Sequence, residues 1–415
     1  MRCASKVLSI ILPYFDFQLV APSWYSGRLW LIRLGFYKLH RPKMIADDWI
    51  WIVDHSVQLG QEKCLIILGI RACDLPRNRP LIYSDVEPIE MIPVKESNGE
   101  IVYKQLEATI KKTGIPREII SDAGPDLKAG VNVFLSQHPE TCGIYDIKHK
   151  TAIILKHALA DDEIWLSFTK CCTSTKKQVQ QTELAFLAPP QQRSKARYMN
   201  IDTLIQWGVK ALNFVETERS IPSKKLDQNR IQEKLGWIVE YKDKLNEWSE
   251  TMAMVGIAES KIRNNGITKD SPSQLQAAFY QYESQNEFNL YPQANKIKHE
   301  LLWFMKNESS KVKDNECLLG SSEIIESLFG KQKYLEAGQS NSGFTGLILS
   351  VGAFLSQTTT AVITDAMATV KTKTIHAWIK EKIGNTVQSC RKKFLNVGRE
   401  NSNNTEQKEN QPEAA

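Results

Sequence analysis

The chain has 415 residues, of which 42% are apolar and 24% are charged, and its formal net charge is +6. This composition is typical of a folded globular protein with room for two or three domains, and the mild basic excess fits an anionic partner without proving one. The eight cysteines form no Cys-x-x-Cys pair and show no Cys/His ligand spacing, so we expect neither a zinc site nor a disulfide scaffold.

The first segment, residues 1–46, is apolar, aromatic and basic, and it shows no clear periodicity. Pro13 and Asp16 interrupt its opening apolar run, which is not typical of a signal peptide. No helix-turn-helix pattern is recognisable in it. We interpret this stretch as an amino-terminal segment, with a truncated DNA-binding region as the alternative.

Residues 47–172 follow a pattern that predicts strands first and then alternating helices and strands. A near-continuous apolar run, as in residues 48–56, is typical of a strand buried on both faces, and residues 63–70 are predicted to be its hairpin partner. The expected strands are 48–56, 63–70, 89–94, 118–121 and 142–147. The expected helices are 99–113, 126–137 and a longer stretch from residue 149. This order predicts an α/β fold in which helices flank a mixed five-stranded sheet.

The second half of the chain is predicted to be helical. Residues 173–320 carry no strand signal, and their apolar residues recur at three-to-four spacing, which predicts a helical insertion. Helices are expected again over 321–395, whereas the Asn-, Gln- and Glu-rich tail 396–415 is expected to be disordered. The long uncharged stretch 337–364 contains much Ser, Thr, Gln and Gly, so a buried helix is preferred to a membrane span.

Three acids stand out along this pattern. Asp54 ends the first predicted strand, Asp122 ends the fourth, and Glu326 belongs to the first helix after the insertion. Carboxylates at neighbouring strand ends can share a divalent cation, and a pair of such cations drives in-line displacement at phosphorus. Taken one at a time, Asp122 could equally start a turn and Asp54 could simply end a strand. Asp126 is expected to cap the helix that follows.

Three motifs resemble those of bacterial insertion-sequence DDE transposases. The stretch Ser121-Asp-Ala-Gly-Pro-Asp126 is similar to the Ser-Asp-Asn-Gly-Pro-acid signature around the second catalytic Asp of retroviral-type integrases. Asp146-x-x-His149 resembles the Cys/Asp-x-x-His motif of several transposase superfamilies, and Glu326 followed by Lys333 resembles the Glu-x6-Lys element of insertion-sequence transposases. These motifs identify the chain as similar to that family over roughly residues 45–365.

The rest of the chain agrees with this resemblance in one respect and departs from it in two. One branch of the superfamily carries a helical insertion between the fifth strand and the catalytic helix, as expected here. The Tyr-x2-Arg portion that precedes the Glu in some relatives is absent, since Leu319 and Ser322 occupy those places. No separate amino-terminal DNA-reading domain is visible either.

The resemblance implies a ribonuclease H-like catalytic domain that cleaves DNA strands and transfers them. Asp54, Asp122 and Glu326 would be the catalytic residues and would bind two Mg²⁺ ions, with Mn²⁺ as a substitute. Glu323 competes as the third ligand, because two residues three apart share a helix face; the Glu-Ser-Leu-Phe-Gly-Lys sequence favours Glu326. The implied partners are the element's ends and target DNA, bound by a homo-oligomer in the bacterial cytoplasm, at the nucleoid, and no membrane is involved.

Several further residues are candidates for secondary roles. Asp146 and His149 either orient metal or DNA, or they form a polar pair that fixes the start of a helix. Lys331 and Lys333 follow Glu326 closely enough to lie near the scissile phosphate. In the insertion, a basic group is expected to contact DNA phosphates, although a solvated surface would also explain it. That group is Arg193, Lys195 and Arg197.

Three other functions remain as alternatives at this point. A ribonuclease H-like nuclease would share the acids but would not need the insertion to recognise DNA ends. An inactive or domesticated transposase could act only as a DNA-binding protein. A hydrolase that uses a carboxylate pair on sugars would leave the late Glu-x6-Lys helix without an explanation.

Overall fold

The structure is a computed structural model of the whole chain. It describes residues 2–15, 19–57, 62–122, 124–192, 197–217, 227–286, 290–337, 345–385 and 389–395. The expected disordered tail, 396–415, therefore lies outside the described residues.

The chain forms two compact units, each described here by itself. The first, called the sheet unit, comprises Met1–Pro76, Leu81–Gly143 and Ser322–Ala415. The second, called the helical unit, comprises Arg77–Pro80 and Ile144–Ser321. The expected start of the insertion at residue 173 falls inside a continuous helix, Glu163–Val179, so the helical unit begins earlier than the sequence pattern suggested.

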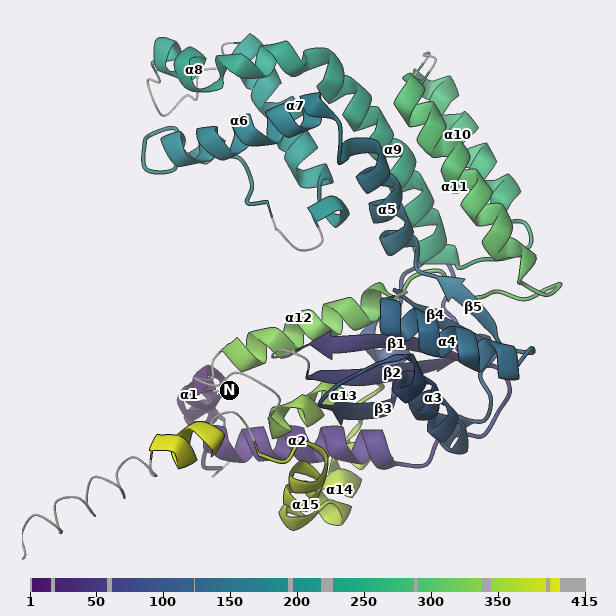
Figure 1. Cartoon of the computed structure of the whole chain (residues 1–415). Coiled ribbons are helices and arrows are strands. Elements are labelled where there is room, and N and C mark those ends of the chain that lie inside the picture. The colour runs from purple at the N-terminus through teal and green to yellow at the C-terminus, as the bar shows by residue number, and fades with distance from the viewer. Residues whose placement is uncertain are drawn as a thin grey trace, which may run out of the picture. The chain divides into compact units, whose positions relative to one another are not determined.

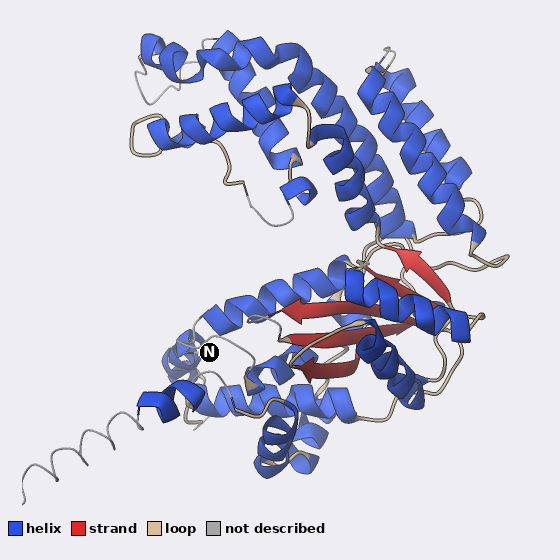
Figure 2. Ribbon diagram, in the orientation of Figure 1, coloured by secondary structure: helices blue, strands red, loops and turns tan. Residues whose placement is uncertain are grey.

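One five-stranded mixed sheet organises the sheet unit, as the sequence predicted (Figures 1 and 2). Its strands are β1 Trp49–Val57, β2 Lys63–Arg71, β3 Glu87–Val94, β4 Glu118–Ser121 and β5 Cys142–Tyr145. They lie in the order β3-β2-β1-β4-β5. β1 pairs antiparallel with β2 and parallel with β4, and β2 pairs antiparallel with β3. The long apolar runs of β1 and β2 are buried on both faces, as expected for central strands.

One face of the sheet packs against α3 (Gly99–Thr113) and α4 (Pro125–Gln137). β1 contributes its odd-numbered residues to this core, because successive side chains of a strand point to opposite faces. The buried core comprises Trp49, Trp51, Val53, Leu65, Ile67, Ile89, Val102, Leu106, Ile119, Leu127, Val131 and Phe134. The even-numbered residues of β1 consequently lie on the opposite face, which carries α12 (Glu323–Ala337).

The ends of the chain add helices to the same unit. They are α1 Arg2–Ile11, α2 Trp24–His40, α13 Ser350–Phe354, α14 Thr360–Thr369 and α15 Thr372–Lys382. α2 is tied to the segment after α13 by Lys38, which is fully buried and donates hydrogen bonds to the carbonyls of Leu355 (2.5 Å) and Ser356 (3.1 Å). Residues 24–40 are therefore part of the sheet unit, and the interpretation of residues 1–46 as a possible truncated DNA-binding region stays a prediction.

The uncharged stretch that resembled a membrane segment instead forms short elements. Gly346–Leu349 is a 3-10 helix that leads into α13, and all four of its residues are buried. None of the helices in the described part of the chain is long and apolar enough to cross a membrane. The expected burial is therefore found for residues 346–353, whereas most of residues 357–364 are exposed.

The helical unit contains seven α-helices among the described residues. They are α5 Ile147–Leu159, α6 Glu163–Val179, α7 Asp202–Glu216, α8 Gln228–Leu235, α9 Lys242–Asn265, α10 Ser271–Asn286 and α11 Pro292–Ser310. An aromatic cluster forms part of its core: the rings of Trp165 and Trp248 meet edge to face at 4.9 Å, and Phe168 packs beside both. Elsewhere in the described residues, the 3-10 helices are Leu12–Tyr14, Ala72–Asp74, Tyr83–Asp85, Ala185–Leu187, Arg197–Met199 and Gly236–Tyr241.

Candidate active site

Two of the three candidate acids occupy neighbouring positions just beyond the paired segment of the parallel strands β1 and β4. Asp122 directly follows β4, but β1 continues to Val57, so the expectation that Asp54 ends its strand was wrong. In the register of β1 and β4, Val53 pairs with Ser121, and the next residues are Asp54 and Asp122. Adjacent strands lie about 4.8 Å apart, so the two backbone positions are close. The expectation that Asp54 and Asp122 lie on adjacent strands is confirmed.

Both acids hold the same place in the alternation of side chains. Val53 belongs to the core under α3 and α4, so Asp54 lies on the opposite face of β1. Ile119 belongs to that same core, which places Ser121 with it and Asp122, one residue later, in the position equivalent to Asp54. The register and the alternation therefore assign both carboxylates to the face that carries α12.

Glu326 reaches the same level of the sheet along α12. Figure 1 shows α12 lying along β1 and running in the same direction. The two elements touch where Ser56 Oγ lies 3.5 Å from Oε1 of Gln332. Glu326 precedes Gln332 by six residues, about 9 Å along a helix, and Asp54 precedes Ser56 by two residues, about 7 Å along a strand. Glu326 therefore lies at roughly the level of Asp54.

Local hydrogen bonds orient two of these carboxylates. Oδ1 of Asp122 accepts a hydrogen bond from the backbone N–H of Gly124 at 2.9 Å, which closes a tight turn before α4. A Cβ atom on Gly124 would lie 3.4 Å from that same oxygen, which is an ordinary van der Waals contact. Oδ1 of Asp54 lies 2.6 Å from the N–H of His55. The side chain of Glu326 is half-buried, and its Oε1 atom is shielded from solvent.

The three acids share one face, but their side chains do not form a ready-made metal centre. Among the described residues, no group of three or more His, Cys, Asp or Glu side chains is placed to hold a metal ion. The pair Asp54 and Asp122 is brought together by the register, whereas Glu326 is brought to the same face and level. Glu323 begins α12, and Glu326 follows in the same first turn, where either acid also suits the positive end of the helix dipole.

A second charged group lies on the other face of the sheet, behind the turn that carries Asp122. Asp126 accepts a hydrogen bond from Nζ of Lys63 at 2.6 Å, and Nδ1 of His55 lies 3.5 Å from the same oxygen. The N-cap of α4 is Gly124, so the expectation that Asp126 caps this helix was wrong; it sits in the first turn and pairs with Lys63 instead.

The surroundings of Asp126 and His55 shift the pKa of both side chains. Burial alone would raise the pKa of Asp126, but hydrogen bonds from Lys63 and Ser97 lower it to about 2. Burial lowers the pKa of His55 to about 4, and the charge of the Asp126 carboxylate opposes this shift because it raises the same pKa. Sequence reasoning missed Lys63 and His55, because their partner lies on a third element far along the chain.

Asp146 and His149 form a helix cap in the helical unit. The carboxylate of Asp146 accepts a hydrogen bond from the N–H of His149 at 2.8 Å and lies 3.1 Å from its Nδ1 atom. Asp146 is fully buried and precedes α5 directly. Of the two expected roles, fixing the start of a helix is therefore the one that the contacts explain.

The candidate DNA-binding residues have varied surroundings. Nζ of Lys331 lies 4.0 Å from the ring centre of Tyr83, which is a cation–π contact within the sheet unit, and Lys333 is exposed two residues later. Arg193 and Lys195 lie outside the described residues, as does the side chain of Arg197.

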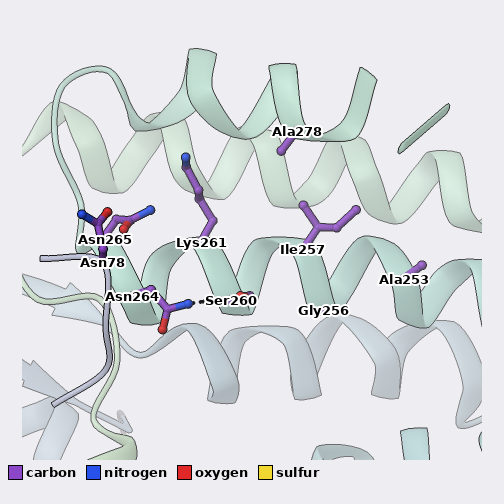
Figure 3. Close-up of a pocket in the computed structure, with 9 residues that line it drawn as sticks. All are labelled: Asn78, Ala253, Gly256, Ile257, Ser260, Lys261, Asn264, Asn265 and Ala278. Carbon is purple, nitrogen blue, oxygen red and sulfur yellow. Dashed lines mark hydrogen bonds between the residues drawn. The ribbon is translucent and has the colours of Figure 1, made fainter. Parts of the chain in front are cut away.

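A cavity of about 630 Å³ lies in the helical unit between α9 and α10 (Figure 3). Its lining residues are Asn78, Ala253, Gly256, Ile257, Ser260, Lys261, Asn264, Asn265 and Ala278. Lys261 is the one charged residue among them, and no carboxylate, histidine or cysteine lines the space. This cavity is consequently unsuited to hold a metal ion.

A scan against protein-family models and a search of the curated proteins both return no match for this chain. Function is therefore inferred from the motifs and from the geometry of the sheet unit. The strongest geometric element is the pair of acids that follow the paired segments of β1 and β4, on the face that carries α12.

Proposed function

We propose that the chain is a DDE transposase with a ribonuclease H-like catalytic domain, and that Asp54, Asp122 and Glu326 are its catalytic carboxylates. The observation that supports this most is the parallel pairing of β1 and β4, which puts Asp54 beside Asp122 on the face crossed by α12. The order β3-β2-β1-β4-β5 fits the architecture that the motifs imply. The helical unit separates β5 from α12, as in the branch of the family with a helical insertion.

The donor set fits a hard divalent cation. All three candidate ligands are carboxylates, and Mg²⁺ and Mn²⁺ prefer oxygen ligands. Two such cations, when bound, activate an attacking water or 3′-hydroxyl and stabilise the leaving oxygen of a phosphodiester. Within the protein, the turn closed by Gly124 holds Asp122, the sheet holds Asp54, and α12 carries Glu326.

The proposed chemistry is in-line displacement at phosphorus, without a covalent enzyme intermediate. Strand cleavage uses water as the nucleophile, and strand transfer uses the 3′-hydroxyl that cleavage releases. The partners would be the ends of the mobile element and target DNA, and the DNA would be bound by a homo-oligomer at the bacterial nucleoid. Lys331 and Lys333 follow Glu326 on α12 and would offer positive charge to the phosphates.

The test is cleavage and joining of DNA duplexes that carry the sequences flanking the coding region, with Mg²⁺, with Mn²⁺ and with a chelator. The variants are Asp54→Asn, Asp122→Asn, Glu326→Gln, Glu323→Gln and Asp48→Asn. We expect the first three to lose at least about 100-fold in rate, because they remove ligand charge and keep side-chain shape. Glu323→Gln and Asp48→Asn are controls that should remain active.

Full activity in the chelator, or in Glu326→Gln but not in Glu323→Gln, would contradict the assignment of these ligands. Cleavage without any joined product would favour the ribonuclease H-like nuclease over the transposase. No cleavage by the unaltered chain, together with specific binding of the duplexes, would favour the inactive or domesticated DNA-binding protein.

A further inference from the structure

The outer face of α11 in the helical unit carries an exposed stripe of basic and aromatic residues. The stripe consists of Lys296, His299, Trp303 and Lys306, all of them exposed. They follow one another at spacings of three, four and three residues, which places them on one face of the helix. Trp303 is 63% exposed.

The stripe retains its positive charge. Among the described residues, no ion pair involves Lys296 or Lys306, whereas Lys298, on another face of the same helix, pairs with Glu283 of α10 at 2.6 Å. Glu300 borders the stripe but is only partly exposed. The surface therefore presents two lysines and a histidine around an indole, with one flanking acid.

The core of the helical unit does not account for Trp303. α11 already buries an apolar face, formed by Ile297, Leu301, Phe304 and Met305, and this helix packs against α9 and α10. An exposed indole with one lysine about two turns before it and another about one turn after it suits a ligand that has both negative charge and flat rings. A nucleic-acid strand offers both, through its phosphates and its bases.

We propose that this stripe binds a DNA strand with unpaired bases: Lys296 and Lys306 contact phosphates, and a base stacks on Trp303. The two lysines are ten residues apart, which corresponds to about 15 Å along the helix, enough to follow a few nucleotides. The proposal rests on the proposed function for the identity of the partner. It uses other residues than the carboxylates, however, and places a strand-binding surface in the helical unit.

The test is binding of the full-length chain to a single-stranded oligonucleotide and to the corresponding duplex, measured over a range of salt concentrations without divalent cations. The double variant Lys296→Gln with Lys306→Gln should flatten the slope of log K against log salt by about 1.4 for the single strand, since each phosphate contact contributes about 0.7. Trp303→Ala should weaken single-strand binding about tenfold and change duplex binding less, because stacking needs an unpaired base.

A matched control removes two lysines of the same unit that already have acidic partners. Lys242 pairs with Glu216 and Lys269 pairs with Asp314, so Lys242→Gln with Lys269→Gln makes the same change in net charge. An unchanged slope in the stripe variant, or an equal change in the control, would overturn the proposal. Loss of single-strand binding in the stripe variant would support it even if the carboxylate variants cleaved normally, in which case only the proposed function would fail.

Discussion

Divalent cations should stabilise the unaltered chain through Asp54, and Asp54→Asn should remove that stabilisation. Asp54 and Asp122 follow paired residues of parallel strands, so their charges are expected about 5 Å apart. Two such charges repel by between about 1 kcal/mol in a water-like medium and about 3 kcal/mol at an effective dielectric constant of 20. A cation that both carboxylates bind removes this repulsion, and therefore binds the folded state in preference to the unfolded state.

The size of the effect follows from binding linkage. At a Mg²⁺ concentration of 100 times the dissociation constant, the folded state gains about 2.7 kcal/mol, which corresponds to roughly 5–10 °C in Tm for a cooperative unit of this size class. If the loss of one carboxylate weakens binding 100-fold, the gain falls to about 0.4 kcal/mol. Asparagine keeps the oxygen that lies near the N–H of His55, so the fold should survive the change.

The assay is thermal unfolding of the unaltered chain, Asp54→Asn and Asp48→Asn, each in a chelator and in a series of Mg²⁺ and Mn²⁺ concentrations. Asp48 lies just before the other end of β1 and pairs with Arg71, so its variant tests loss of an acid outside the site. A cation-dependent shift in Tm that persists in Asp54→Asn, or one that disappears equally in Asp48→Asn, would refute the reasoning.

Two further predictions concern stability. Gly35→Ala should destabilise the sheet unit by about 1–3 kcal/mol in urea unfolding, because a Cβ there would lie 1.8 Å from the carbonyl oxygen of Leu349. The control is Gly27→Ala in the same helix, whose Cβ would meet nothing within 4 Å and which should stabilise the unit by about 0.5–1 kcal/mol. Equal effects of the two substitutions would contradict the close approach of α2 and α13. The pKa of Asp126 is lowered to about 2 from an ordinary value of 3.8, so its ionised form contributes about 2 kcal/mol above pH 4, and this is lost as the pH falls through 2. Asp126→Asn should therefore be less stable at pH 7 and show a flatter stability profile between pH 4 and pH 2, and an unaltered profile would exclude this role.

The sequence was sufficient to predict the sheet and one pair of acids. β1 and β4 are buried runs, and an acid directly follows the segment of each strand that pairs with the other, so period and burial pointed to Asp54 and Asp122. The sequence did not show that β1 continues beyond Asp54 to Val57. The position of Glu326 along β1 could not be derived in this way. It depends on how α12 lies on the sheet, and the motif pointed to Glu326 without giving the placement of that helix.

Contacts between distant elements were beyond sequence reasoning. The pairing of Asp126 with Lys63 and His55 joins α4, β2 and β1, and neither partner is marked by a local pattern. The helix α2 in the first segment was not recognised from the sequence for a related reason. Residues on several sides of α2 contact other elements, and a helix that packs on several sides loses the one-sided apolar period by which amphipathic helices are recognised.

The course of the chain through the helical unit explains how an acid more than 200 residues after Asp122 can still lie on the same face of the sheet. The chain leaves the sheet unit after Gly143 and returns at Ser322. Within the helical unit these two ends lie side by side, because the N–H of Ile147 donates a hydrogen bond to the carbonyl of Gly320 at 3.1 Å. A short bridge between Ile267 and Leu318 fixes the returning segment.

An inserted unit whose ends are adjacent imposes little strain on its host, whatever its length. The start of α12 is therefore set by the point of return and not by the number of residues in between. The helical unit can consequently change in sequence and in surface, as in the α11 stripe, while the spacing of Asp54, Asp122 and Glu326 in the sheet unit stays the same. This independence is what would allow one part of the chain to hold DNA strands while another performs the chemistry.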